Sequence, residues 1–212
     1  MCRYNSGFFF RHPLLLKYAW YWRVEPDIDF YCSIPYDPFT YMRENEKVYS
    51  FIIALPEYRE TIPTLWETTR TFCQANPQYV AKRNSLAFIV DDGAGWEGDY
   101  NNCHFWSNFE IASLEFWRGE AYLKYFEYLD QSGGFYYERW GDAPVCPSFS
   151  QIPFLFLTAF VELRACFGGY EGLIEVRCTV LQRHCSCQWT RFIGLAIWDI
   201  AIIHGHIVLP MT

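Results

Sequence analysis

The sequence predicts an α/β fold with a largely parallel sheet. Along residues 1–144, short apolar segments of β type alternate with amphipathic segments of helical period, which is the pattern of strand–helix–strand units. Hydrophobic residues make up 51% of the chain and charged residues 19%, so a buried core is expected and intrinsic disorder is not. The net charge of −7 argues against a general nucleic-acid-binding protein, which would carry a basic surface.

Four segments have the composition of strands. Residues 18–24 are aromatic and β-branched, and residues 48–55 form an apolar run that stops at Pro56. Residues 86–90 end at a turn signal, and residues 135–138 follow a glycine pair. The sequence therefore predicts a strand over each of these ranges.

Two longer segments have helical periodicity. A helix is expected after Thr61, with Pro63 in its first turn and an apolar face that includes Leu65 and Phe72. A second helix is expected over residues 113–129, because Phe116, Leu123, Phe126 and Leu129 fall on one stripe. A break is expected after it, at Ser132-Gly-Gly.

The chain changes character near Pro144. Residues 1–144 contain 33 charged residues, whereas residues 145–212 contain only eight. We therefore predict a domain over 1–144 and an aberrant apolar tail over 145–212.

Two carboxylates follow the first predicted strand, in Glu25-Pro26-Asp27. Glu25 and Asp27 supply hard oxygen ligands of the kind that Mn²⁺ or Mg²⁺ binds, and such a cation neutralises a diphosphate leaving group. The alternative is an ordinary acidic turn.

Residues 102–110 combine amide, imidazole, indole, hydroxyl and carboxylate groups. Glu110 is a candidate nucleophile or base, and Asn108 and Trp106 are candidate contacts to a sugar. The alternative is that the polar groups are satisfied by the backbone and that Glu110 is solvated.

Residues 138–144 place an indole and a guanidinium beside carboxylates. Trp140, Arg139 and Asp142 suit sugar recognition, because an aromatic ring stacks on a pyranose while a carboxylate accepts its hydroxyl protons. The alternative is a turn with a buried tryptophan.

Five motifs together resemble a known family. They are Cys2-Arg-Tyr-Asn-Ser-Gly-Phe-Phe-Phe, Tyr21-Trp-Arg-Val-Glu-Pro-Asp, Tyr36-Asp-Pro-Phe, Cys103-His-Phe-Trp-Ser-Asn-Phe-Glu and Phe135-Tyr-Tyr-Glu-Arg-Trp-Gly-Asp-Ala-Pro. In this order they resemble the fungal α-1,2-mannosyltransferases of glycosyltransferase family 15, over residues 1–144 and not beyond.

The resemblance implies a partial GT-A fold, which is Rossmann-like, and a retaining transfer of mannose from GDP-mannose with Mn²⁺. The implied acceptors are mannosylated glycoproteins or glycolipids in N-linked, O-linked or lipid glycosylation, and the implied location is the Golgi membrane and lumen. By their place in the motifs, Glu25 and Asp27 are implied to be metal ligands. Glu110 is implied to be the nucleophile or the carboxylate that stabilises the oxocarbenium ion. The implied sugar-binding loop contains Asp142, Arg139 and Trp140. A Cys32–Cys103 disulfide is a further expectation.

The chain also departs from the family. We expect the membrane anchor and the first nucleotide-binding strands to be absent before Met1, and the family's Gly-Tyr-x-His-x-Pro segment, which supplies a metal-binding histidine, does not occur. The expectation is therefore family membership without activity of this 212-residue chain. The alternative function is a non-catalytic lumenal domain that binds a sugar or a partner.

The tail has a specific expected origin. The family continues Trp-Gly-Asp-Ala-Pro with Val-His-Ser-Ile-Ala-Ala, whereas Val145-Cys146 can be encoded by GTATGT, a fungal 5′ splice signal. From the third base of an AGG codon at Arg177, the shifted frame can spell that continuation and the missing Gly-Tyr-x-His-x-Pro segment. Residues 145–212 are therefore predicted to be a retained intron followed by a frameshifted exon.

Overall fold

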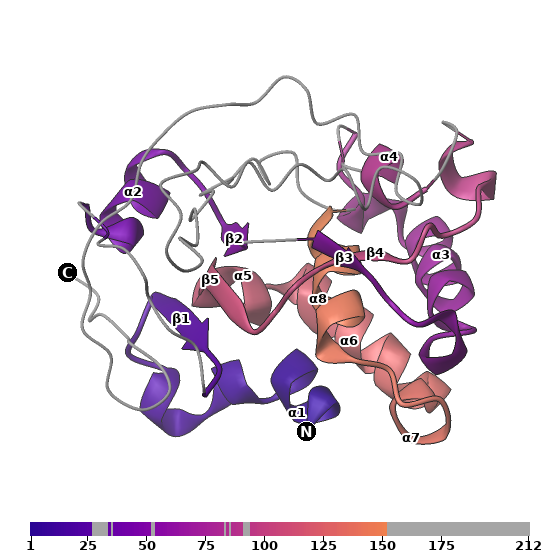
Figure 1. Cartoon of the computed structure of the whole chain (residues 1–212), viewed down its shortest axis with the longest axis horizontal. Helices are drawn as coiled ribbons and strands as arrows, with labels where there is room; N and C mark the ends of the chain where they lie inside the picture. The colour runs from indigo at the N-terminus through magenta and orange to yellow at the C-terminus, as the bar shows by residue number, and fades with distance from the viewer. Residues whose placement is uncertain are drawn as a thin grey trace, which may run out of the picture.

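The computed structural model describes residues 1–26, 34, 36–51, 54–82, 84, 86–90 and 94–151, and these form an α/β unit (Figure 1). Its strands are β1 (Trp20–Val24), β2 (Tyr49–Phe51), β3 (Ala54–Pro56), β4 (Cys103–Phe105) and β5 (Phe109–Ser113). Its α-helices are α1 (Cys2–Gly7), α2 (Pro38–Glu44), α3 (Leu65–Ala75), α4 (Leu86–Ile89), α5 (Leu114–Arg118), α6 (Glu120–Ser132), α7 (Gly134–Tyr137) and α8 (Asp142–Gln151). Short 3₁₀ turns are η1 (Phe9–Arg11), η2 (Pro13–Leu15), η3 (Arg59–Thr61), η4 (Pro77–Tyr79) and η6 (Gly95–Glu97).

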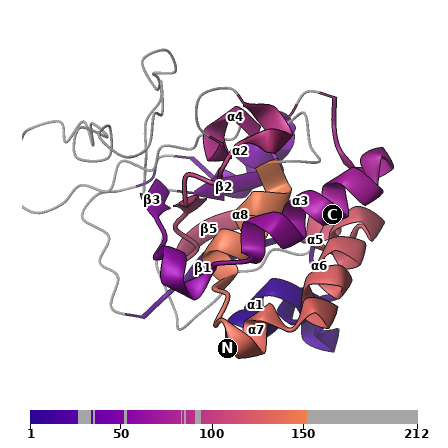
Figure 2. The ribbon, with the colours of Figure 1, turned by 90° about the vertical axis from the view of Figure 1, so that its right-hand side faces the viewer.

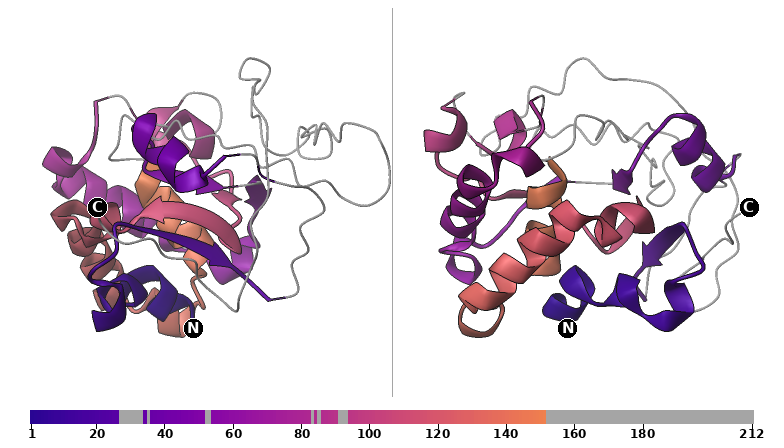
Figure 3. Two further views of the ribbon diagram at one scale, coloured as in Figure 1. Left: turned by 90° about the vertical axis from the view of Figure 1, so that its left-hand side faces the viewer. Right: turned by 180° about the vertical axis from the view of Figure 1, so that it is seen from behind.

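The central sheet has the strand order β1-β5-β2, with β5 in the middle (Figure 3). Both neighbours run antiparallel to β5, so Arg23 of β1 and Phe51 of β2 lie opposite Glu110 from its two sides. In the next row on the same face of the sheet, Tyr21 and Tyr49 lie opposite Ala112. A second pair, β3 and β4, is also antiparallel.

The expected mostly parallel sheet is therefore not what the described strands form. β1 and β2 do share a direction, with α2 between them in the chain, as a strand–helix–strand unit requires. However, β5 lies between them and hydrogen-bonds to both, and its direction makes each described pairing in this sheet antiparallel. The α/β class itself is as predicted.

The two faces of the sheet are covered by different helices. Trp22, Phe109 and Ile111 pack with Phe39 and Met42 of α2 on one face. The other face meets the larger core, to which α3, α5, α6 and α8 contribute buried residues. Figure 2 shows these helices gathered beside the sheet, with α1 near the end of α6. Alternate residues along β1 and β5 point to opposite faces of the sheet, and both faces are buried.

Two predicted strands are helical turns. Residues 86–90 contain α4, because Leu86 and Ile89 are buried together at helical spacing, and Val90 makes only an isolated bridge to Tyr100. Residues 135–138 overlap α7, a single turn that follows the left-handed Gly133 (φ +82°) at the end of α6. Short apolar runs carry too few residues for their period to separate strand from helix.

The other predicted elements are present with shifted bounds. The segment 18–24 contains β1, and the segment 48–55 contains β2 and most of β3, whereas residues 52 and 53 lie outside the described part. The first predicted helix begins at Leu65 rather than near Thr61, which ends η3. The second is divided into α5 and α6 by Gly119, whose backbone is extended.

Helix α8 continues past the predicted domain boundary at Pro144. Val145 and Cys146 are buried in the larger core, with 0% and 7% of their surface exposed. Residues 152–212, most of the predicted tail, lie outside the described residues, as do Asp27 and Cys32.

Candidate active site

Glu110 is a buried carboxyl group at the centre of the sheet. Only 4% of the residue is exposed, yet both of its oxygens accept hydrogen bonds. Tyr21 Oη donates to Oε1 at 2.6 Å, and Tyr49 Oη donates to Oε2 at 2.7 Å. The predicted alternative, a solvated Glu110, is wrong.

The environment of Glu110 raises its pKa to about 7. Burial is the largest cause, because it disfavours the charged form, and the nearby carboxylate of Asp142 acts in the same direction. The positive charge of Arg23 and the two tyrosine hydrogen bonds oppose this rise. A carboxyl group poised near neutral pH is a frequent property of catalytic sites.

Arg23 joins the separate acidic motifs of the sequence. It lies opposite Glu110 in the sheet, its Nη1 donates to Oδ2 of Asp142, and its Nε donates to Oε1 of Glu25 at 2.9 Å. Burial lowers the pKa of Arg23, but the carboxylates of Asp142 and Glu110 outweigh burial and leave it raised. Arg23 is therefore a permanent cation that brings three predicted site residues together.

Asp142 is placed at this site by the start of α8. Its side chain is 12% exposed and also accepts a hydrogen bond from Ser107 Oγ at 3.1 Å. Ser107 lies in the short turn between β4 and β5, so the second and third acidic motifs meet through this contact.

Glu25 is more accessible, with 36% of its side chain exposed. Its backbone N–H donates to the carbonyl oxygen of Asn108 at 3.0 Å, which extends the β1–β5 pairing by one residue. Its Oε1 is held by Arg23, and no hydrogen bond or ion pair is formed by Oε2 within the described residues. Glu25 thus retains one oxygen for a further ligand.

The other predicted contacts differ in their accessibility. Asn108 and Trp106 are half-buried, and Trp106 packs against the cluster beneath α2. Arg139 is exposed and has a positive φ of 69°. The hydrogen bonds to the Glu110 carboxyl group in the described structure come from tyrosines and not from Trp106 or Arg139.

Trp140 does not offer an open ring face. It is 1% exposed, its Nε1 donates to Oε2 of Glu138 at 2.8 Å, and Phe135 packs edge-to-face against it. The buried tryptophan considered from the sequence is what the structure shows, because Gly134 lets the backbone approach the indole closely. We assign Trp140 to support of the loop rather than to sugar stacking.

His104 is a further buried polar group beside Asp142. Burial lowers the pKa of this imidazole, although Glu57, a hydrogen bond with the backbone of Asn102 and Asp142 oppose the shift. Its Nδ1 has no hydrogen-bond partner among the described residues. The ring is therefore neutral near pH 7, with one nitrogen left for a water or ligand.

Comparison with known proteins identifies the family. Residues 1–157 match the family described as glycolipid 2-alpha-mannosyltransferase, which is close to three-quarters of the chain. The chain belongs to this mannosyltransferase family.

Individual relatives agree with this assignment. "Glycolipid 2-alpha-mannosyltransferase 2" of Candida albicans is 64% identical over 146 residues, which are 68% of this chain and 31% of the relative. "Alpha-1,2 mannosyltransferase KTR1" of Saccharomyces cerevisiae is 60% identical, over 68% of this chain and 36% of the relative. The chain thus spans about a third of the length of these mannosyltransferases.

Solved structures confirm the fold. Core-mannan synthase A (CmsA/Ktr4) of Aspergillus fumigatus, in an Mn/GDP form, matches with a TM-score of 0.67 and 47% identity, over 72% of this chain and 42% of its own. Ktr4p of S. cerevisiae in complex with GDP matches with a TM-score of 0.68 and 44% identity, over 72% and 40%. The expected GT-A class is therefore correct for the described part of this mannosyltransferase-family chain.

The described residues do not form a manganese site by themselves. No group of three or more His, Cys, Asp or Glu side chains is placed to hold a metal ion there, and Asp27 lies outside this part of the chain. Glu25 Oε2 fits the role of one hard ligand among several. None of the helices in the described ranges is long and apolar enough to cross a bilayer.

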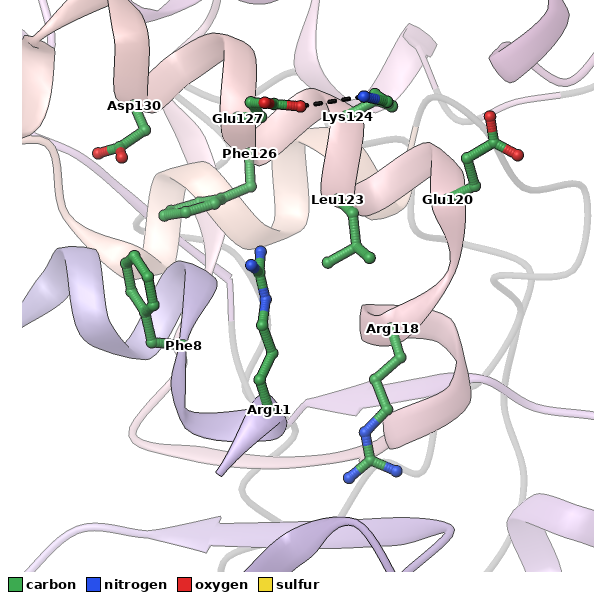
Figure 4. Close-up of a pocket in the computed structure, with 9 residues that line it drawn as sticks. All are labelled: Phe8, Arg11, Arg118, Glu120, Leu123, Lys124, Phe126, Glu127 and Asp130. Carbon is green, nitrogen blue, oxygen red and sulfur yellow. Dashed lines mark hydrogen bonds and ion pairs between the residues drawn. The ribbon is translucent and has the colours of Figure 1, made fainter. Parts of the chain in front are cut away.

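A pocket of about 600 Å³ lies elsewhere, between the α1–η1 segment and α6 (Figure 4). It is lined by the apolar side chains of Phe8, Leu123 and Phe126 and by charged side chains of both signs. Arg118, one of the charged lining residues, donates to three backbone carbonyl oxygens and thereby stabilises the fold. None of the sequence-predicted site residues lines this pocket.

Sequence reasoning missed three of the groups that build the site. Arg23, Tyr21 and Tyr49 were not singled out, although Tyr21 and Arg23 alternate along a predicted strand. Residues two apart in a strand point to the same face of the sheet, so Tyr21 and Arg23 share a face. A charged arginine on a buried face needs a carboxylate partner, and this was the signal for the site.

Proposed function

We propose that the protein is a retaining α-1,2-mannosyltransferase that transfers mannose from GDP-mannose to mannosyl acceptors on glycoproteins or glycolipids in the Golgi lumen. The observation that carries the proposal is Glu110, a buried carboxyl group held by two tyrosines and faced by Arg23. The names of the relatives and the GDP bound in the Ktr4 structures support the choice of donor and reaction.

In this reaction the bond between the anomeric carbon and the diphosphate oxygen breaks, and the acceptor hydroxyl forms the new bond on the same face. The acceptor proton leaves with the diphosphate or through a base. An anionic Glu110 assists either by forming a glycosyl ester that the acceptor then displaces, or by stabilising the oxocarbenium-like transition state. Both routes need an ionised Glu110, which Arg23 and the tyrosines favour.

Asp142 and Glu25 have different roles in the proposal. Asp142, held by Arg23 and Ser107, is proposed to accept hydrogen bonds from sugar hydroxyls. Glu25, together with Asp27, is proposed to ligate the Mn²⁺ that would neutralise the diphosphate charge. Asn108, Trp106 and Arg139 are proposed as peripheral substrate contacts.

Transfer of labelled mannose from GDP-mannose to methyl α-mannoside tests the proposal, using protein made in a fungal host from the spliced message predicted for this gene. Glu110→Gln is nearly isosteric, so it should keep the fold and donor binding but lower transfer by about a hundredfold or more. Glu127→Gln, on the exposed side of α6, is the control and should transfer normally.

The same experiment distinguishes the proposed enzyme from the alternative, a non-catalytic binding domain. Binding of mannosides without Mn²⁺ and without transfer would indicate a non-catalytic sugar-binding domain. Transfer by Glu110→Gln at the wild-type rate would remove Glu110 from the mechanism while leaving the family assignment intact.

A further inference from the structure

Glu110 lies in a cradle made by the two strands that flank β5 in the central sheet. Tyr21 on β1 and Tyr49 on β2 approach it from opposite sides, and each hydroxyl donates to a different oxygen of the carboxyl group. Two donors on two oxygens fix both the position and the rotation of the carboxylate plane.

The register of the sheet explains how the cradle forms. Tyr21 and Tyr49 lie in one cross-strand row, on either side of Ala112, and Glu110 belongs to the adjacent row on the same face. Ala112 is fully buried and small, so both rings can lean across it toward Glu110. A larger residue at this position would occupy the space that the rings need.

The two tyrosines are also constant donors. Burial is the largest cause that raises the pKa of Tyr21 and of Tyr49 well above the ordinary value. The negative charge of Glu110 and the hydrogen bond to it act in the same direction. Both hydroxyls therefore keep their protons throughout the pH range in which a carboxyl group titrates.

We propose that Tyr21 and Tyr49 are positioning residues that hold Glu110 in one orientation and keep it available as an anion. The inference deepens the proposed function and rests on it for its catalytic meaning. Among the described residues, the other ionisable groups that interact with Glu110 are Arg23 from β1, and Asp142 and Cys146 from α8.

The first measurement is made on the wild-type 212-residue chain, labelled with ¹³C at the glutamate carboxyl and the tyrosine phenol carbons. As Glu110 titrates near pH 7, the phenol signals of Tyr21 and Tyr49 should shift with the same midpoint. Tyr125, equally buried but bonded to Thr69, should not report this midpoint. Absence of the shared midpoint at both tyrosines would overturn the proposal.

The second measurement uses matched hydroxyl deletions. Tyr21→Phe and Tyr49→Phe should each raise the pKa of Glu110 by about one unit, because each removes a hydrogen bond to the charged form. Tyr125→Phe deletes an equally buried hydroxyl and should leave this pKa unchanged. An equal shift in all three variants would show a general effect of repacking and would contradict the proposal.

Kinetics, measured on the protein prepared for the mannose-transfer assay, then separate positioning from binding. Tyr21→Phe should lower kcat about tenfold with little change in the KM for GDP-mannose. The titrations require no sugar, so the two proposals can fail separately. If the tyrosine signals follow the titration of Glu110 but mannose is not transferred, the proposed function is rejected and the positioning role of the tyrosines stands. If mannose is transferred but the tyrosine signals do not follow Glu110, the positioning role is rejected and the proposed function stands.

Discussion

Arg23 and Asp142, 119 residues apart in the chain, form a largely buried ion pair between β1 and the first residue of α8. The pair connects β1, which Glu25 directly follows, to the start of α8. Two sequence motifs that were recognised independently therefore depend on each other in the folded protein.

Arg23→Met should destabilise the protein by about 3 kcal/mol, because it leaves a buried Asp142 carboxylate without its cation. The pKa of Glu110 should rise as well, since Arg23 is the largest influence that lowers it. Urea unfolding at pH 7 measures the stability. Lys124→Met breaks an exposed pair on α6 and should change stability very little. Equal stability of Arg23→Met and Lys124→Met would contradict the importance of the Arg23–Asp142 pair.

Glu110 should make the protein less stable as the pH rises. Its folded pKa of about 7 exceeds the ordinary value of 4.5, so the folded state binds the proton more tightly. Stability from this group is complete below about pH 4.5 and is lost as the pH rises through about 7. Glu110→Gln has no such titration. Its free energy of unfolding, relative to that of the wild type, should therefore increase by about 2–3 kcal/mol from pH 5 to pH 8.

Unfolding curves at both pH values check this expectation. His104, whose folded pKa is lowered, contributes in the opposite direction, but its contribution is the same in both chains and cancels in the difference. A pH-independent difference between wild type and Glu110→Gln would show that Glu110 titrates normally.

Glu25→Ala should raise the Mn²⁺ concentration needed for GDP binding, because it removes one proposed ligand of the ion that would neutralise the diphosphate. Calorimetric titration of GDP at several Mn²⁺ concentrations measures the effect. Glu127→Ala is the matched control on an exposed helix face. An unchanged Mn²⁺ requirement in Glu25→Ala would place the metal elsewhere.

Gly134→Ala should lower stability by about 1–3 kcal/mol. A Cβ atom at this position would lie 2.1 Å from the indole of Trp140, so the ring or the α7 backbone must move. Combining Gly134→Ala with Trp140→Phe should cost less than the sum of the single changes, because the smaller ring leaves room. Additive costs would show that the close approach is relieved in another way.

The origin of residues 145–212 is tested at the level of the transcript. The predicted intron runs from Val145 through two bases of the Arg177 codon, which is 32 codons and two bases and therefore shifts the frame. Sequencing of mature messages should find a spliced form that continues in the family frame. A message that always contains the segment, or genomic DNA without AG at Arg177, would refute the prediction.

The sequence identified those site residues whose chemistry is visible within a short segment of the chain. Glu110, Asp142 and Glu25 were selected because carboxylates in unusual polar contexts are visible in a linear sequence, and the structure joins them through Arg23. The cradle was not visible, because which residues of β1, β2 and β5 share a row depends on long-range register.

The fold was predictable to a similar degree. The amphipathic period of α3 and α6 identified these helices, and the aromatic run identified β1. By contrast, β4 and β5 were hidden by the polar residues of the site, since His104 and Glu110 interrupt an otherwise apolar pattern. Functional residues that violate local patterning are the expected place for such failures.

The central position of β5 has a consequence for how the site is lost. Strands paired on both edges exchange their amide hydrogens only in the rarest openings of a domain, whereas edges and terminal turns open often. The amides around Glu110 should therefore be among the last to exchange with deuterated solvent. Glu110 should stay enclosed during partial fraying of the molecule, and its cradle should disappear only when the whole domain unfolds cooperatively.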